Sequence, residues 1–358
     1  MTTTPTPTQA DAALSLMQSV LRDARPMAAE YPLLFGPAAA GRFETVEVDG
    51  EVASTCAWIR RDLLVGGLEL PVALVGSVAT RADLRGNGYG TTVVERAVAR
   101  AAEAGAALTL LWADESDWYQ ERGWVPFGTE NVFVVNENNA FLLPDATGVR
   151  EMEERDLAAV HSLYCTHESR VARSEAETRV MMATPGTRAL VREVDGAVTA
   201  YACVGRGEDL AHCVHEWAGG PDDVLPVVAA HWSATRELND RLFIMVPETE
   251  ANFVAYFTFI RSLGAKGILA MARVADIGAL GGVLDQLTPA EVTVQVVGDR
   301  ALSLAGPSGS IVLNEQELLL VLCPPRGDRR VTSVMEAELG LELPNLPIEP
   351  YAWGFDSI

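Results

Sequence analysis

The segment from Leu68 to Gly105 constrains the fold of this chain more than any other. Residues 68–80 are apolar and β-branched, which predicts a strand, and residues 91–104 predict a helix that stops at Gly105. A glycine-rich turn joins them, Arg85-Gly86-Asn87-Gly88-Tyr89-Gly90. A strand that passes through such a turn into a helix directs several backbone N–H groups at one point, where the helix dipole adds partial positive charge. The segment therefore predicts an α/β fold with a phosphate-binding turn.

The order of the predicted elements divides the chain into three parts. Residues 136–148, rich in Asn, Pro, Asp and Gly, form the best linker. We expect a first domain over residues 1–140, a second over 149–285 and a small α+β module over 286–358. The second part repeats the order of elements of the first without an obvious sequence repeat, which indicates a duplicated fold.

Four local features of the first part give testable expectations. Asp11 is placed to cap the first helix. Asp49-Gly50 predicts a two-residue hairpin turn between strands. Gly76, inside the predicted strand 68–80, marks a bulge or a close backbone approach. Residues 124–135 are expected to return as a single strand.

Charge and composition exclude several classes of protein. The formal net charge of −22, without any basic block, argues against nucleic acid as a partner. No apolar run approaches the roughly 18 residues needed to cross a bilayer, so no membrane partner is expected. The five cysteines are scattered without CxxC spacing, which suits the reducing cytoplasm better than a disulfide framework.

A metal site is not expected either. All five histidines lie in the second part, and His212 and His215 are separated by a spacing that puts them on opposite faces of a strand. The counterpart of the glycine turn in the second part ends in Asp222 and Asp223, which would repel a pyrophosphate. The second domain is therefore interpreted as a wall of the substrate cleft rather than as a second cofactor site.

The turn Arg85-x-x-Gly88-x-Gly90 resembles the Q/R-x-x-G-x-G/A signature of the GNAT acetyltransferase superfamily. The resemblance implies acetyl-CoA as the co-substrate, with its pyrophosphate held by the turn. It also implies that the backbone of Val78 and Thr80 pairs with pantetheine. The cofactor-binding residues it predicts are Val78, Ala79, Thr80, Arg85, Gly86, Asn87, Gly88, Tyr89, Gly90 and Thr91.

A second stretch, residues 111–124, is similar to the branch of this superfamily named for enhanced intracellular survival (Eis). The resemblance implies that Tyr119 protonates the departing thiolate, whereas an aromatic plug beside Trp118 and Trp124 is the alternative. It also implies that the terminal carboxylate of Ile358 enters the first domain as a candidate base. The fold it implies is a pair of GNAT-like domains with mixed sheets, followed by a sterol-carrier-like module. Asp114 departs from the branch, where serine is usual.

Together these resemblances imply an N-acetyltransferase that modifies a primary amine by direct attack. The acceptor would be an aminoglycoside, a polyamine or a lysine side chain. A GNAT-fold protein that holds acyl-CoA and regulates without turnover is the alternative, because the strand 72–80 has no carboxylate to act as a base. A homo-oligomer is compatible with either reading.

Overall fold

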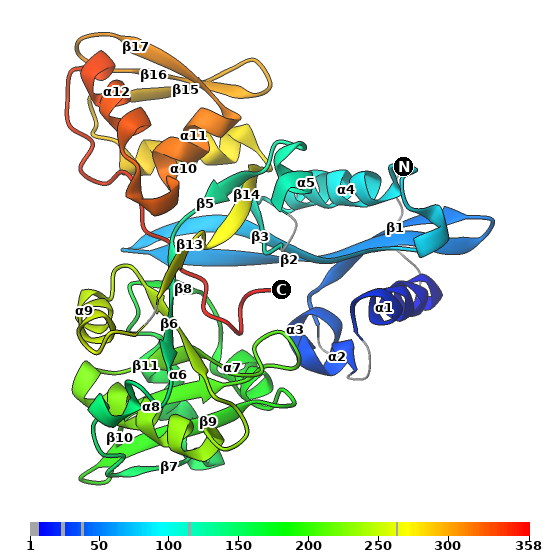
Figure 1. Ribbon diagram of the computed structural model, residues 1–358. Helices are drawn as coiled ribbons and strands as arrows, with labels where there is room; N and C mark the ends of the chain where they lie inside the picture. The colour runs from blue at the N-terminus through cyan, green and yellow to red at the C-terminus, as the bar shows by residue number, and fades with distance from the viewer. Residues whose placement is uncertain (1–6, 23–25, 37–38, 114–115, 263) are drawn as a thin grey trace.

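The computed structural model describes residues 7–22, 26–36, 39–113, 116–262 and 264–358. Asp114 lies outside these residues. A seven-stranded mixed sheet crosses the middle of the molecule (Figure 1). Its order is β1-β2-β3-β4-β14-β5, with β8 paired to β2. The strands are β1 (Arg42–Val48), β2 (Glu51–Val65), β3 (Leu68–Thr80), β4 (Leu108–Leu111), β5 (Val125–Phe127), β8 (Ser169–Val171) and β14 (Ala270–Val274).

Helices cover both faces of this first sheet. Met17 of one helix shares a core with Ile59 of β2, whereas Val93 of another packs with the neighbouring residue Trp58. Alternate residues of a strand point to opposite faces, so the two helices lie on opposite sides. The helices are α1 (Pro7–Leu21), α2 (Met27–Glu30), α3 (Pro32–Phe35), α4 (Tyr89–Glu103) and α5 (Ser116–Gln120).

A second seven-stranded sheet forms the lower part of Figure 1, in the order β13-β6-β12-β11-β10-β9-β7. Its strands are β6 (Glu130–Val135), β7 (Val149–Glu151), β9 (Arg188–Val194), β10 (Ala197–Val204), β11 (Cys213–Ala218), β12 (Leu242–Pro247) and β13 (Ala265–Gly267). Its helices are α6 (Leu157–Tyr164), α7 (Glu175–Met182), α8 (Pro221–Thr235) and α9 (Ala251–Phe259). Ser174 caps α7 through a reciprocal capping box with Glu177.

The two large sheets exchange strands. β6 follows β5 directly in sequence but pairs with β12 of the second sheet. In return β14, from the second part of the chain, pairs with β4 on one side and β5 on the other. The consecutive ranges 1–140 and 149–285 therefore do not coincide with the two sheets.

The third module packs on the first sheet. It has a three-stranded antiparallel sheet with helices against it, seen at the top of Figure 1. Leu318 of this module and Leu280 of α10, which begins before the expected boundary at residue 286, belong to the same hydrophobic core as Leu74 of β3. The elements are β15 (Thr293–Val297), β16 (Ala301–Ala305), β17 (Ser310–Asn314), α10 (Ile277–Leu287), α11 (Glu315–Leu322) and α12 (Arg330–Leu339).

Of the four local expectations, the turn at Asp49-Gly50 and the bulge near Gly76 are confirmed, and the other two are wrong. Asp49 and Gly50 take φ of 54° and 80° in the turn between β1 and β2, as predicted. Asp11 does not cap a helix, because α1 already begins at Pro7. The single strand expected over 124–135 is interrupted at Gly128, whose φ of 68° turns the chain from the first sheet into the second.

The last residues of the chain form a tail that returns between the two large sheets (Figure 1). The ring of Trp353 stacks on His167 with centroids 4.1 Å apart. The Arg206 guanidinium donates to the carbonyl oxygens of Gly354 and Ser357. The tail, residues 351–358, is thereby fastened to the second domain.

A buried cluster of charges completes this attachment. Arg173 donates to both carboxylate oxygens of Glu216, at 2.6 and 2.9 Å, and neither side chain reaches solvent. Asp356 of the tail accepts a hydrogen bond from Tyr164 and lies 3.8 Å from Arg173. The cluster thus holds one cation and two carboxylates. Burial raises the pKa of Asp356 to about 6, although Arg173 opposes this effect.

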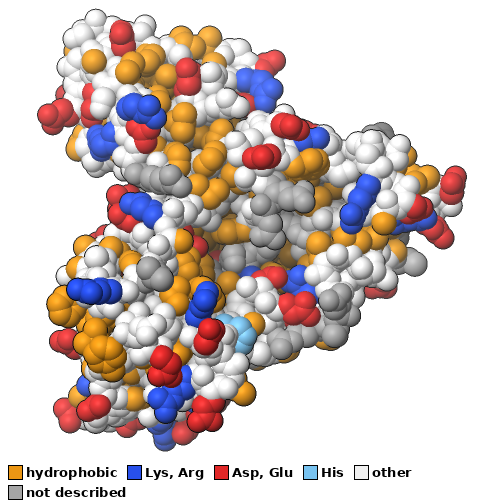
Figure 2. Space-filling model, in the orientation of Figure 1, with side chains coloured by type: hydrophobic (Ala, Val, Ile, Leu, Met, Phe, Trp, Pro, Cys, Tyr) orange, Lys and Arg blue, Asp and Glu red, His pale blue; other side chains and the backbone are white. Residues whose placement is uncertain are grey.

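No helix among the residues that the structure describes is long and apolar enough to span a membrane. Acidic and basic side chains are interspersed over the face in Figure 2.

The raised pKa of Asp356 predicts a pH-dependent effect of Asp356→Asn on stability. From pH 4 to 6 the folded chain retains a proton that the unfolded chain has lost, so the wild type loses unfolding free energy as pH rises through this window. The Asn side chain cannot ionise. The free energy of unfolding of the variant should therefore equal that of the wild type at pH 4 and exceed it by about 2–3 kcal/mol at pH 7. Urea unfolding at several pH values measures this difference. The exposed control Asp299→Asn should show no such trend, and a pH-independent difference for Asp356→Asn would contradict the assignment.

Candidate active site

An open cleft of about 770 Å³ lies where β3 and β4 separate. The two strands pair only through residues 72–74 of β3 and 108–110 of β4, and β3 then continues alone to Thr80. A bulge accompanies the separation, because Ser77 and Val78 together stand opposite Cys56 of β2. Ser77 has a left-handed φ of 55°. The bulge expected at Gly76 is therefore present beside this residue, and it leaves an open stretch of backbone along the cleft.

The glycine turn forms one end of the cleft. Gly86 and Gly88 take φ of 80° and 79°, and a Cβ at either position would meet nothing within 4 Å. Glycine is thus used here for its left-handed conformation and for the open space over the turn. Gly88 precedes α4 without a side-chain cap. The N–H groups of the first turn of α4 are consequently available to a ligand, and a phosphate at a helix N-terminus suits them.

Eight of the ten expected cofactor residues line this cleft: Val78, Thr80, Arg85, Gly86, Gly88, Tyr89, Gly90 and Thr91. Ala79 and Asn87 do not. Ala79 points into the core, as the residue between Val78 and Thr80 on a strand must. The Ala79 carbonyl accepts from Ser54 on the neighbouring strand. The Asn87 amide turns back to donate to the carbonyl of Leu84 and so stabilises the turn itself.

Arg122 is a cleft residue that sequence reasoning missed. Its Nε donates to Thr91 Oγ1 at 2.9 Å, and its guanidinium lies 4.0 Å from the centre of the Trp118 ring. The Arg122 side chain, which follows α5 in sequence, therefore places a positive charge beside the first turn of α4. Its place within residues 111–124, the stretch that resembles the Eis branch, was the one sequence signal that pointed to it.

Tyr119 reaches the cleft from α5. Its ring makes edge-on contacts with Trp118, 4.7 Å away between centroids, and with Trp124 at 6.0 Å. Tyr119 therefore packs against the two tryptophans and also lines the cleft, because its side chain is only partly buried.

The tail brings Ile358 against Gly76 of β3. A Cβ at Gly76 would lie 2.7 Å from both the carbonyl carbon and an oxygen of Ile358. Gly76 itself also lines the cleft. The absent side chain at Gly76 therefore lets the end of the tail meet the strand at the point where the cleft begins.

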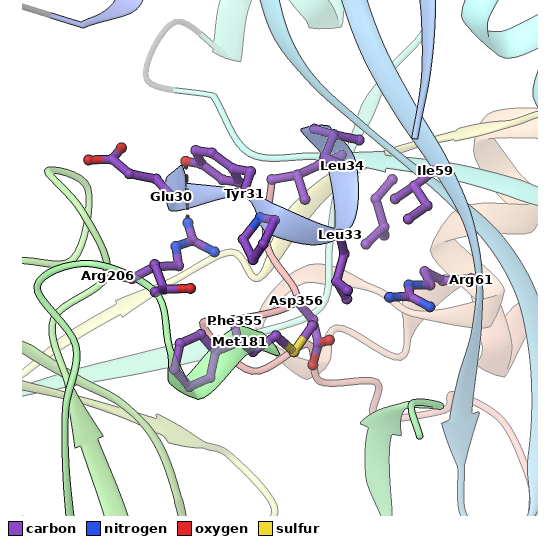
Figure 3. A pocket seen from close by; sticks show the side chains of 14 residues that line it. Glu30, Tyr31, Leu33, Leu34, Ile59, Arg61, Met181, Arg206, Phe355 and Asp356 are labelled. Carbon is purple, nitrogen blue, oxygen red and sulfur yellow. Dashed lines mark hydrogen bonds between the residues drawn. The ribbon is translucent and has the colours of Figure 1, made fainter. Parts of the chain in front are cut away.

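A second pocket adjoins Ile358 and is shown in Figure 3. It lies between α2, α3, β2 and the tail, and Arg206 donates to the Tyr31 hydroxyl across it. Glu30 and Asp356 are each only 3% exposed. Among the residues that the structure describes, Glu30 Oε1, Asp356 Oδ1 and Thr184 Oγ1 have no hydrogen-bond partner. Two carboxylate oxygens and a hydroxyl that lack partners suit a ligand with N–H donors.

The histidines considered for a metal site are separated in the structure. His215 is fully buried, and one of its ring nitrogens is hydrogen-bonded to the Gly205 carbonyl. Burial lowers the pKa of His215 to about 3. Within the described ranges no group of three or more His, Cys, Asp and Glu side chains is arranged to hold a metal ion.

Comparison with known proteins agrees with this geometry. Residues 3–127 match the family model described as an acetyltransferase (GNAT) domain. A search of curated proteins finds no match.

Several solved structures share the fold over nearly the whole chain. A GCN5-related N-acetyltransferase from Anabaena variabilis is 12% identical, with a TM-score of 0.69 and 99% of each chain covered. One from Kribbella flavida is 15% identical, with a TM-score of 0.67, and the match covers 99% of this chain and 97% of that one. Eis1 from Mycobacterium abscessus is 14% identical, with a TM-score of 0.64 and 97% of each chain covered. At these identities the likeness concerns the fold.

The family model covers the glycine turn, the separated strands and Tyr119, which are the parts that build the cleft. We conclude that residues 3–127 of this chain form an acetyltransferase domain of the GNAT family, within a chain that has the overall fold of GNAT N-acetyltransferases.

Proposed function

We propose that this protein transfers the acetyl group of acetyl-CoA to a primary amine of a small polycation or of a lysine side chain. The observation that carries the proposal is the contact between Gly76, which lines the cleft with the phosphate-type turn, and Ile358, which lines the pocket with Glu30 and Asp356. A donor and an acceptor could thus reach one point from different directions.

The residues of the cleft fit acetyl-CoA. The left-handed glycines leave space above the N-terminus of α4, Arg85 and Arg122 supply positive charge, and the bulge exposes the backbone of β3. Acetyl-CoA supplies a thioester carbonyl to the attacking amine. Tyr119 would hold the proton that the leaving sulfur needs, and N–H groups of the bulge near Val78 would polarise the carbonyl.

The second pocket, about 30 Å³ in volume, has room for the amino end of an acceptor beside its polar groups. Glu30 and Asp356 offer unpartnered acceptors to an ammonium group, and the terminal carboxylate of Ile358 stands between this pocket and β3. That carboxylate would remove the proton that makes the amine non-nucleophilic. It thereby takes the place of a carboxylate on β3, which has none after Glu69. All five cysteines are free thiols, which fits action in the cytoplasm.

The central experiment measures acetyl-CoA binding by calorimetry and then thiol release with aminoglycosides, polyamines and lysine peptides. Saturable binding followed by release with an amine is expected. Binding without release would favour the regulatory alternative, and absence of binding would contradict the proposal.

Gly88→Asp should weaken acetyl-CoA binding at least about a hundredfold, because it places a carboxylate where the turn would hold pyrophosphate. Gly88→Asn is the matched control, since Asn has nearly the same shape and also tolerates a left-handed φ. The control should lose much less affinity in the same calorimetric titration. Equal losses for both variants would assign the effect to backbone strain instead of charge.

Tyr119→Phe should lower kcat about a hundredfold and leave the dissociation constant of acetyl-CoA unchanged, because it removes only the proton donor. Stopped-flow thiol release and calorimetry separate the two quantities. Tyr256→Phe, on α9 outside the cleft, serves as the control phenol. A wild-type kcat for Tyr119→Phe would leave Tyr119 with a packing role alone.

Gly76→Ala should lower kcat at least about tenfold, because the new methyl group displaces Ile358 from its position against β3. Binding of acetyl-CoA should change little. The control is Gly282→Ala on α10, where a Cβ meets nothing within 4 Å. Full activity of Gly76→Ala would show that the position of Ile358 is irrelevant to turnover.

A further inference from the structure

The second domain has a cleft at the place that corresponds to the acetyl-CoA cleft of the first. β11 and β12 pair only through Cys213–Val214 and Phe243–Ile244 and then separate, as β3 and β4 do. β11 leads through Gly219 and Gly220 into α8, as β3 leads into α4. The cleft between the strand ends has a volume of about 470 Å³. It is lined by residues from three segments and the tail, namely Thr166, His167, Glu168, Ser169, Gly219, Gly220, Pro247, Thr249, Glu250, Tyr351 and Trp353.

This second-domain cleft is closed to coenzyme A by its own side chains. His167 Nε2 lies 2.8 Å from the Trp217 carbonyl of β11, and Trp217 Nε1 donates to the Met245 carbonyl of β12. The carbonyl groups of β11 and β12 along which pantetheine would lie are thus already hydrogen-bonded to side chains. Asp222 and Asp223 stand in the first turn of α8, where a phosphate would need to bind. An anionic ligand is disfavoured at this position.

Two hydrogen-bond acceptors face each other across the remaining space. Because a carbonyl oxygen only accepts, His167 must carry its proton on Nε2, which leaves Nδ1 as an acceptor. His167 is 8% exposed, and its Nδ1 lies 4.0 Å from Glu250 Oε1 without a hydrogen bond. Burial lowers the pKa of His167 to about 4, so the ring is neutral at pH 7. No donor among the described residues stands between the two atoms.

Further charges around the cleft have the same sign. Glu168 lines it and contributes to the raised pKa of Glu250, whose main cause is burial. Arg170 donates to the His167 carbonyl at 2.6 Å and does not line the cleft. A ligand that carries positive charge and several N–H groups would satisfy both acceptors at once.

We propose that the second-domain cleft binds a small organic cation whose primary ammonium group donates to His167 Nδ1 and to the Glu250 carboxylate. A metal ion is disfavoured because the described residues provide no group of three ligating side chains. This site is separate from the acceptor pocket beside Ile358, with which it shares no lining residue. Tyr351 and Trp353 nevertheless belong to the same tail, so an occupant contacts the segment that carries Ile358.

Calorimetric titration of the full chain with spermidine tests the site. Glu250→Gln should weaken this binding at least about tenfold, because it removes the charge that pairs with the ammonium group. Glu168→Gln should weaken it less, since the carboxylate oxygen 4.0 Å from His167 Nδ1 belongs to Glu250. Glu237→Gln, beyond the opposite end of α8, removes an equal charge and should have no effect. Unchanged acetyl-CoA binding in all variants verifies the fold.

Two results would overturn the proposal. If spermidine binds the wild type and Glu250→Gln with equal affinity, it occupies another site, such as the pocket beside Ile358. Saturable Zn²⁺ binding that Glu250→Gln abolishes, with no binding of spermidine to the wild type, would assign the cleft to a metal ion.

Discussion

The buried ion pair between Arg173 and Glu216 is the interaction on which the arrangement of the tail depends. A guanidinium removed from water requires a partner of opposite charge and good hydrogen bonds, and Glu216 supplies both through two contacts. Tyr201 donates a further bond to the same carboxylate. Asp356 of the tail then adds a second carboxylate beside Arg173. The second domain thus holds the tail between the two sheets through hydrogen bonds from Tyr164 and Arg206, although it lacks an open cofactor edge of its own.

The same attachment explains how three parts of the chain make one site. The first domain contributes the turn, the separated strands and Tyr119, whereas α2 contributes Glu30 and the second domain contributes Arg206. The tail connects them, because Arg206 binds its carbonyls and Gly76 leaves room for its last residue. In this arrangement the proposed donor and acceptor pockets adjoin where Ile358 lies against Gly76 of β3.

Elements that depend on neighbouring residues could be predicted from the sequence. Elements that depend on contacts between distant segments could not. The strand 68–80, the turn 85–90 and the helix after it follow from apolar periodicity and glycine spacing, and the structure has them nearly residue for residue. Ala79 was included among cofactor residues because a motif names a segment, whereas the pleat of the strand decides which side chains face the ligand. Glu30 and Asp356 belong to no motif, and Arg122 lies in a motif stretch that assigns it no role. These residues become site residues only through packing between segments far apart in sequence. The change of sheet at Gly128 was equally hidden, since β5 and β6 together look like one apolar strand.

The exchange of strands also has a consequence for biosynthesis. The first sheet has a gap between β4 and β5 until residues 270–274 have left the ribosome, by which time three quarters of the chain has been made. Until then two strand edges of the first domain remain unpaired, and such edges invite association with other chains. The N-terminal half therefore cannot mature as an independent unit during translation, as the first domain of many multidomain proteins does. The incomplete sheet of the nascent chain therefore leaves β4, one of the two strands that border the cofactor cleft, without its second partner.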